Sequence, residues 1–250
     1  MNDDGSAQPS EAVGVDTAAD TNGDGHNPPR LSRALILDAA IDFIDHHGLS
    51  KLTMRRLGAA CDVEAMALYR YVHSRGDLLT GIVEHIVDRL LVDQLAARRQ
   101  EDGWQDYLVR LAHGVRQIAL DHPDVFPLVA TQPPEIPWVR PPLRSLRWME
   151  TFLDTLICYG FDDVAAVEAY RSYTTFLLGQ LLLEVSARGA QLHSEDDAIL
   201  DNAHHSERAL SDYPHLKRLQ PTLSQDCGAT EFEESLEALL DRLELLVSRR

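Results

Sequence analysis

The sequence predicts an all-α protein, and the first observation behind this fold class is the spacing of its apolar residues. Ile36, Ala39, Ala40, Phe43 and Ile44 recur at the i, i+3, i+4, i+7 and i+8 positions of one helix face. The second observation is that glycine, or histidine followed by proline, ends several of these apolar patterns. The third is that no segment alternates apolar and polar residues for long enough to predict a strand.

Three helices are expected close together near the start of the chain. The first begins after Ser32, which is a suitable N-cap, and ends at Gly48. Residues 53–61 form a second, short helix, and an Asp-Val turn separates it from a third over about 64–72. We expect the faces on which these two short helices pack together to carry Leu57, Ala60, Cys61, Leu68 and Val72.

The remainder of the chain continues as helices. Ser74, with Asp77 three residues later, has the pattern of a capping box and starts a fourth helix. An apolar stripe between residues 108 and 119 predicts the next one, which ends at a His-Pro pair. Seven of the twelve prolines lie between 123 and 142, so short helices and loops are expected there. Further helices are predicted over 143–159, 163–188 and 230–248.

Composition bounds the class of protein. The chain has 250 residues, of which 44% are hydrophobic, enough for one sizeable core or two modest ones. Its longest apolar runs are far shorter than the roughly 20 residues of a membrane span, and no secretory signal pattern is visible. Cys61, Cys158 and Cys227 follow no metal or redox spacing. We therefore expect a cytoplasmic protein with reduced thiols, no membrane association and no cofactor.

The charge of the chain is unevenly distributed. The formal net charge is −17, which by itself argues against a nucleic-acid partner. Residues 1–30 carry six acidic groups and one arginine, and with few large apolar groups they are predicted to be a disordered acidic tail. Residues 31–80 carry six acidic and six basic groups, so this block is neutral. A neutral block can still present a basic edge, and the local potential matters more for DNA than the total.

The two short helices and their tight turn match the helix-turn-helix arrangement, in which the second helix enters the major groove of DNA. Packing through Leu57 and Leu68 would leave the opposite face in solvent. The side chains on that face are Ala65, Met66, Tyr69, Arg70 and His73. Tyrosine hydroxyls and arginine are suited to phosphate oxygens, so this face is a candidate DNA-binding surface.

The segment ILDAAIDFIDHHGLSKLTMRRLGAACDVEAMALYRYVHSRGDLLTGI resembles the N-terminal domain of the tetracycline-repressor (TetR) family. The likeness rests on the helix ending in HHG, on LT-x-RRL, on the turn CDV and on the LYRYV run. The later segment GFDDVAAVEAYRSYTTFLLGQLLLEV is similar to the penultimate long helix of members close to the tetracycline repressors. The resemblance implies a DNA-binding domain over 31–77 and an effector-binding and dimerisation domain over 78–250.

The resemblance also implies roles for single residues of the helix-turn-helix. Arg55 matches a position that reaches a base edge, and arginine suits the paired acceptors of guanine. The three recognition-helix positions that read bases are apolar here, which leaves methyl contacts to thymine or readout of DNA shape. The residues expected to contact DNA are Thr53, Arg55, Ala65, Met66, Ala67, Tyr69, Arg70, Tyr71 and Arg75.

In the family, the aromatic-rich region beyond residue 100 encloses a pocket for a small effector. The residues expected to line it are Phe126, Trp148, Phe152, Tyr170, Tyr173, Phe176 and Gln180. Val129 and Val164 stand where tetracycline repressors use a metal-binding histidine and a neighbouring glutamate, so a magnesium–tetracycline effector is not expected. The histidines at 193, 204, 205 and 215 follow no familiar metal-ligand spacing and are expected to be solvated.

These observations together predict a homodimeric transcriptional regulator, a repressor, that binds double-stranded DNA at a palindromic operator and is released by a small hydrophobic effector. The alternative is an effector-independent helical dimer that binds DNA or docks another protein, which a pocket too small for a ligand would favour. An enzyme is not expected, because the chain has no GxSxG, HExxH or phosphate-binding glycine loop.

Overall fold

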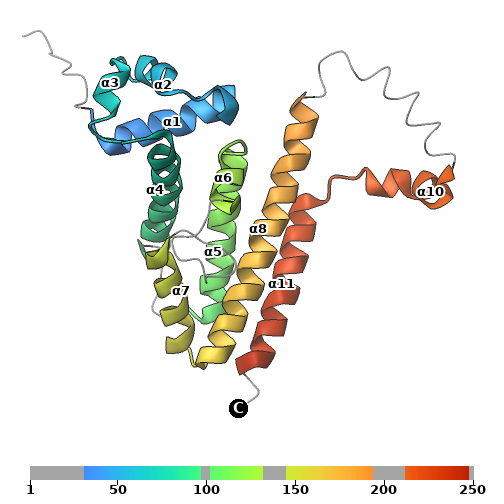
Figure 1. Ribbon diagram of the computed structural model, residues 1–250. Coiled ribbons are helices and arrows are strands. Elements are labelled where there is room, and N and C mark those ends of the chain that lie inside the picture. The colour runs from blue at the N-terminus through green and yellow to red at the C-terminus, as the bar shows by residue number, and fades with distance from the viewer. Residues whose placement is uncertain (1–30, 97–101, 132–144, 194–211, 248–250) are drawn as a thin grey trace, which may run out of the picture. The chain divides into compact units, whose positions relative to one another are not determined.

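A computed structural model of the chain describes residues 31–96, 102–131, 145–193 and 212–247 (Figure 1). The predicted acidic tail and the histidines at 204 and 205 lie outside these residues. Every regular element in the described part of the chain is a helix, which confirms the all-α fold class.

The first helix, α1 (Arg33–His47), is bounded by the two residues expected from the sequence. The hydroxyl oxygen of Ser32 accepts a hydrogen bond from the amide of Leu35 at 3.2 Å and so caps the N-terminus. At the other end Gly48 has a φ of +81°, a backbone conformation that glycine adopts without strain.

Helices α2 (Met54–Ala60) and α3 (Ala65–Leu68) form the helix-turn-helix. The Thr53 hydroxyl oxygen accepts from the Arg56 amide at 3.3 Å and caps α2 as predicted. The regular part of α3 ends four residues before the predicted boundary at Val72, because the chain tightens into turns after Leu68.

The two short helices pack more closely than the sequence indicated. Leu57, Leu68 and Val72 are fully buried at their contact, as expected. Ala60, however, is exposed, and Gly58 takes the inward place. A β-carbon on Gly58 would lie only 2.8 Å from the Val63 carbonyl oxygen, so a residue without a side chain is required for this approach.

The long helices follow in order after the helix-turn-helix (Figure 1). Most of them match the predicted ranges, although α8 continues five residues beyond its expected end at 188, and a helix at 214–223 was not predicted. Their bounds are α4 Arg75–Ala96, α5 Trp104–Asp121, α6 Phe126–Thr131, α7 Leu146–Cys158, α8 Asp163–His193, α10 Pro214–Leu223 and α11 Gly228–Val247.

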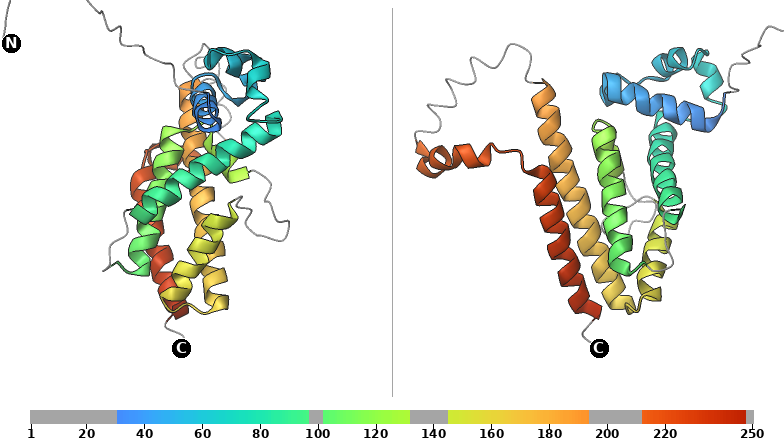
Figure 2. Two further views of the ribbon diagram at one scale, coloured as in Figure 1. Left: turned by 90° about the vertical axis from the view of Figure 1, so that its left-hand side faces the viewer. Right: turned by 180° about the vertical axis from the view of Figure 1, so that it is seen from behind.

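The core joins these helices in two groups. Helix α4 packs against α1 on one side and against α5, α6 and α7 on the other. Helix α8 packs against α5, α6 and α7, and α11 runs antiparallel beside it in every view (Figures 1 and 2). Phe152 on α7 and Tyr173 on α8 are fully buried where α7 and α8 meet, with ring centroids 5.6 Å apart. No helix in the described residues is long and apolar enough to cross a membrane.

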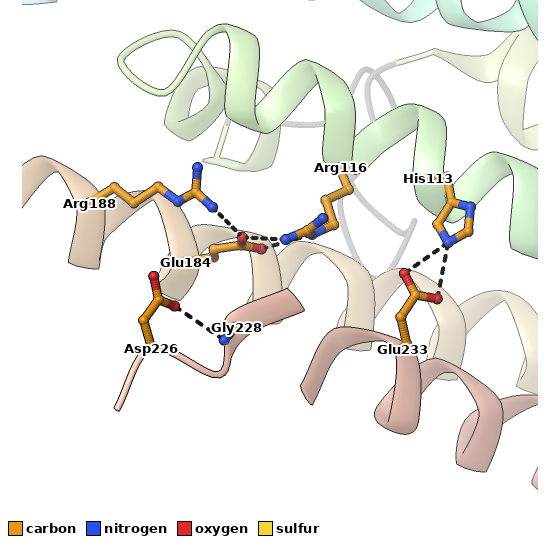
Figure 3. Close-up of polar contacts among 7 residues, drawn as sticks. All are labelled: His113, Arg116, Glu184, Arg188, Asp226, Gly228 and Glu233. Atoms are coloured by element: carbon orange, nitrogen blue, oxygen red, sulfur yellow. Dashed lines mark hydrogen bonds and ion pairs between the residues drawn. The ribbon is translucent and has the colours of Figure 1, made fainter. Parts of the chain in front are cut away.

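Polar contacts tie α5, α8 and α11 together (Figure 3). The guanidinium of Arg116 on α5 donates two hydrogen bonds to the Glu184 carboxylate on α8, at 2.7 and 3.2 Å. Both side chains are largely shielded from solvent, at 17% and 7% exposure. Arg116 also lies 5.1 Å from the centre of the Phe232 ring on α11. A bidentate pair of this kind is a strong and directional contact, so these three helices form a fixed frame.

Candidate functional site

Helix α2, the turn after it and the N-terminal end of α3 border an open groove. Arg55 projects from α2 into solvent and makes no contact with another charged or polar group among the described residues. The neighbouring Arg56 is different, because its guanidinium donates to the Lys51 carbonyl at 3.1 Å. On α3, Met66 is 75% exposed, far more than a methionine with a packing role. Arg55 and Met66 are therefore both available to a ligand.

The other residues expected to contact DNA fall into two groups. Tyr69 and Arg70 are exposed, whereas Tyr71 is half-buried and packs against the core. Arg75 is exposed, but its guanidinium donates to the Leu49 carbonyl at 3.3 Å. The Thr53 hydroxyl accepts from a helix amide, so its own proton stays available for a phosphate oxygen.

Two of the acidic residues of the neutral block, Asp62 and Glu64, lie beside this face. A groove between α2 and α3 is lined by Arg55, Asp62, Glu64 and Ala65, among others. Asp62 has a φ of +55° and lies in the tight turn that joins the two helices. Two acidic groups therefore lie beside Arg55 in this groove and lower the local positive potential.

The link between α3 and α4 is held by Asp77. Its carboxylate accepts from the His73 amide at 2.7 Å, and this hydrogen bond, together with the nearby Arg33 guanidinium, lowers the pKa of Asp77. Arg33 on α1 lies 3.2 Å from the same carboxylate. The Asp77 amide in turn donates to the Ser74 hydroxyl at 3.0 Å, so the predicted cap of α4 is present. These contacts fix α4 to the DNA-binding part of the chain.

A cavity lies between α4, α5, α6, α7 and α8, and its volume is about 50 Å³. Among the described residues its wall is almost entirely apolar. The side chains that line it are Val83, Ile86, Val87, Leu90, Val115, Ile118, Phe126, Val129, Ser145, Trp148, Thr174, Leu177 and Leu178. Apolar cavities with a few polar groups are the usual sites for small ligands.

Two of the seven residues expected in the effector pocket line this cavity, namely Phe126 and Trp148. Phe152, Tyr170 and Tyr173 instead form the buried aromatic layer around them, with the Trp148 and Phe152 rings stacked at 5.2 Å. The remaining two lie elsewhere. Phe176 stacks on Phe232 of α11 at 6.1 Å, and Gln180 lines a polar groove between α8 and α11.

Most of the cavity wall was missed by the sequence analysis. Four wall residues come from α4 and two from α5, and all six are aliphatic. The predicted pocket set consists mainly of aromatic residues and contains none of these six. A signal was present, however, because Val83 and Val87 form a second apolar row on α4 beside the row that begins with Leu78 and Ile82. Both rows reach the cavity, because Ile86 and Leu90, which continue the row of Leu78 and Ile82, line it as well.

No charged side chain lines the cavity within the described part of the chain. Burial raises the pKa of Tyr170 to about 12 and that of Tyr173 well above its ordinary value, so both phenols are neutral at physiological pH. Val129 is part of the cavity wall, whereas Val164 is 76% exposed on α8. Within the described residues no cluster of histidine, cysteine and carboxylate groups is placed to hold a metal ion. His215 is exposed on α10.

Two histidine–aspartate contacts join α1 to the helices around the cavity. His85 on α4 lies 2.8 Å from Asp38. His122, the C-cap of α5, lies 2.6 Å from one oxygen of Asp45. Burial raises the pKa of Asp45, and the hydrogen bond to His122 offsets part of this effect. The other Asp45 oxygen is buried without a hydrogen-bond partner among the described residues, so the carboxylate depends on His122.

Comparison with known proteins identifies both parts of the chain. The family profile described as "Bacterial regulatory proteins, tetR family" matches residues 36–82, which hold the helix-turn-helix. The profile described as "Tetracyclin repressor-like, C-terminal domain" matches residues 97–247 and therefore more than half of the chain.

Individual relatives agree with these profiles. The transcriptional repressor DrrR1 of Streptomyces coeruleorubidus is 24% identical, over 89% of this chain and 80% of its own length. A possible TetR family transcriptional regulator from Streptomyces coelicolor A3(2) is 33% identical, with a TM-score of 0.66 over 86% of this chain and 100% of that one. The S. coelicolor protein ActR, solved with actinorhodin, shares the fold at 21% identity, with a TM-score of 0.64 over 88% and 99% of the two chains.

Proposed function

The chain belongs to the tetR family of bacterial regulatory proteins, and we propose that it is a homodimeric repressor whose effector binds in the cavity and releases the protein from a palindromic operator. The observation that carries this proposal is the position of α4. The helix begins directly after the helix-turn-helix and packs on α1, and four of its side chains also line the cavity. One rigid element is thus in contact with both sites.

The size of the cavity supports a direct link between ligand binding and the position of α4. A free volume of about 50 Å³ holds only a few water molecules, so an effector has to separate the surrounding helices. Helices α5 and α8 resist separation, because the Arg116–Glu184 pair joins them and the Tyr173 hydroxyl donates to the Leu108 carbonyl at 2.6 Å. The aliphatic side chains of α4 in the cavity wall form no such bonds, so α4 is the wall that yields.

Movement of α4 would carry the DNA-binding helices with it. An effector that binds the widened state more tightly than the DNA-binding state shifts the population toward the widened state. The size of this shift is set by the difference between the two affinities. A coupling of about 1–3 kcal/mol changes DNA affinity by roughly 5- to 150-fold, which is enough for regulation. The small volume is also the one observation that favours the alternative, an effector-independent DNA-binding dimer.

Helices α8 and α11 expose apolar side chains that a second copy of the chain would cover. Leu183 on α8 is 73% exposed, and Val167 on α8 and Leu245 on α11 are exposed as well. Nothing would contact a β-carbon added at Gly179, so a partner helix can approach α8 closely there. A two-fold dimer through these helices would present two recognition helices, the arrangement that a palindromic operator requires.

The proposal is tested by DNA selection with the purified full-length protein, followed by binding measurements on the selected site. Recovery of a palindrome supports an operator-binding dimer, and recovery of no preferred sequence contradicts it. A screen of thermal unfolding midpoints over a diverse set of apolar compounds then distinguishes an effector-released repressor from an effector-independent dimer. Compounds that raise the midpoint and also weaken binding to the selected DNA support effector release, whereas their absence supports the effector-independent dimer.

Arg55→Ala and Arg56→Ala form a matched pair for the DNA face, since each removes one positive charge from α2. Arg56 is held by the Lys51 carbonyl, whereas Arg55 is available to a base. Arg55→Ala should weaken binding to the selected operator by about 10- to 100-fold, the contribution of a bidentate guanine contact. Arg56→Ala should weaken it only by the smaller, sequence-independent phosphate contribution. Equal losses in the two variants would remove Arg55 from the base-reading set.

A further inference from the structure

We propose that the effector is an uncharged, metal-free molecule, apolar over most of its surface, with one hydrogen-bond donor that faces Thr174 and one acceptor that faces Ser145. This inference rests on the proposed function, because it takes the cavity to be the effector site. It goes further by assigning the effector's chemical class and its polar contacts from the groups that the cavity wall supplies.

No charged side chain lines the cavity among the described residues, which disfavours an ionic ligand. The described side chains around the cavity are uncharged, and their polar groups are the hydroxyls of Ser145 and Thr174 and the indole N–H of Trp148. An ion placed there would lose its hydration and gain no partner of opposite charge, which is strongly unfavourable. A charged compound should therefore bind on the order of 100-fold more weakly than a neutral one of the same shape. Val129 adds to this selectivity, since a valine in the wall offers no lone pair to a metal chelate.

The first polar group is the hydroxyl of Thr174, on α8. Its side chain is buried, and its proton is already used in a hydrogen bond to the Tyr170 carbonyl at 2.6 Å. A threonine hydroxyl carries one proton and two lone pairs, so the oxygen can only accept a further hydrogen bond. A ligand that meets Thr174 must therefore supply a donor.

The second polar group is the hydroxyl of Ser145, the N-cap of α7. Its oxygen accepts from the Trp148 amide at 3.2 Å, which leaves its own proton to donate. Ser145 can therefore donate this proton to an acceptor on the ligand. Because Ser145 and Thr174 belong to different helices, one ligand that satisfies both has its donor and acceptor at separate points of an otherwise apolar frame.

The charge part of the proposal is tested by calorimetric titration of the full-length protein with 2-naphthol, 2-naphthoate and 2-naphthylmethylammonium. These probes share one apolar frame and differ in charge. We expect 2-naphthol to bind on the order of 100-fold more tightly than either ion. Equal or tighter binding of an ion would overturn the proposal, and so would the absence of binding by all three probes up to their solubility limits.

The hydrogen-bonding part is tested by a cycle that combines 2-naphthol, 2-methoxynaphthalene and the variant Thr174→Val. The methoxy compound cannot donate, and valine cannot accept. Thr174→Val should weaken 2-naphthol binding by roughly fivefold to tenfold and leave 2-methoxynaphthalene binding unchanged. Thr155→Val is the matched control, since Thr155 is also buried and donates to the carbonyl four residues earlier, at 2.7 Å, but does not line the cavity. Equal effects of Thr174→Val on the two probes, or equal effects of the two variants on 2-naphthol, would overturn the assignment.

Failure of this inference can be told apart from failure of the proposed function. The titrations need no DNA, and release from the selected operator is measured separately by fluorescence anisotropy. Selective binding of 2-naphthol without any effect on DNA binding would support the ligand class and contradict effector release. Release of DNA by a charged compound that no neutral compound displaces would support the proposed function and overturn the proposed ligand class.

Discussion

The contact between α2 and α3 can be tested by one added methyl group, in the variant Gly58→Ala. A β-carbon at this position would lie 2.8 Å from the Val63 carbonyl oxygen and 3.1 Å from the Ala65 amide nitrogen. Both neighbours are backbone atoms, so no side chain can rotate away. The two helices would have to separate by a few tenths of an ångström, and α3 would change its position relative to α1 and α4.

The expected cost follows from two opposing effects. Overpacking of a tight contact costs about 1–3 kcal/mol. Alanine in place of glycine inside a helix favours the folded state by about 1 kcal/mol. The free energy of unfolding of Gly58→Ala should therefore fall by about 1 kcal/mol, measured by urea denaturation at fixed protein concentration. Because α3 carries the base-reading positions, affinity for the selected operator should fall by about tenfold, within the range of one lost base contact.

Gly76→Ala is the control for this prediction. A β-carbon on Gly76 would have only the Ser74 hydroxyl oxygen nearby, at an ordinary contact distance of 3.6 Å. The same substitution at this helix position should leave the free energy of unfolding unchanged or raise it by about 0.5–1 kcal/mol. If Gly58→Ala were as stable as Gly76→Ala and bound the operator like the unsubstituted protein, the close approach of α2 and α3 would not require glycine.

Three further predictions concern the core and the domain contact. Phe152→Ala should lower the free energy of unfolding by about 3–5 kcal/mol, because the ring is fully buried; a loss below about 1 kcal/mol in urea denaturation would contradict this. Tyr173→Phe should lower it by roughly 1 kcal/mol through loss of the hydrogen bond to the Leu108 carbonyl, and an unchanged midpoint would refute that contribution. The raised pKa of Asp45 means that its contribution to stability is present in acid and is lost as pH rises through that pKa. Asp45→Asn removes this loss, so its stability relative to the unsubstituted protein should increase as pH rises above 3.8, the ordinary pKa of aspartate; a decrease in parallel denaturation curves would contradict the desolvation argument.

The helix boundaries were predictable where the signals are local. Ser32, Thr53 and Ser74 each accept a hydrogen bond from an amide three residues later, and a cap of this kind is readable from a few residues. The end of α3 was not predictable in this way. Beyond Leu68 the Tyr71 amide bonds to a carbonyl only three residues earlier, so the apolar spacing continues after the regular helix has ended.

The cavity wall was far less predictable than the fold. The predicted set consists mainly of aromatic residues from the right region, but Phe152 and Tyr173 pack against other aromatic rings and do not line the cavity. Most of the wall is formed by aliphatic side chains from α4, α5, α6 and α8, and which side of α4 faces the cavity depends on where its neighbouring helices pack. That information lies in contacts between distant parts of the chain. A helical period cannot encode it.

Helix α1 is attached both to the helix that is proposed to move and to the frame that is proposed to stay. Asp38 binds His85 on α4, whereas Asp45 binds His122 at the end of α5. If an effector displaces α4 and α1 follows, the contact between Asp45 and His122 must stretch or break. Asp45 is partly buried, and its other oxygen already lacks a partner among the described residues, so losing His122 would leave the carboxylate poorly compensated. On the proposed function, this cost would oppose the widened cavity, so the Asp45–His122 pair would favour the conformation with the narrow cavity.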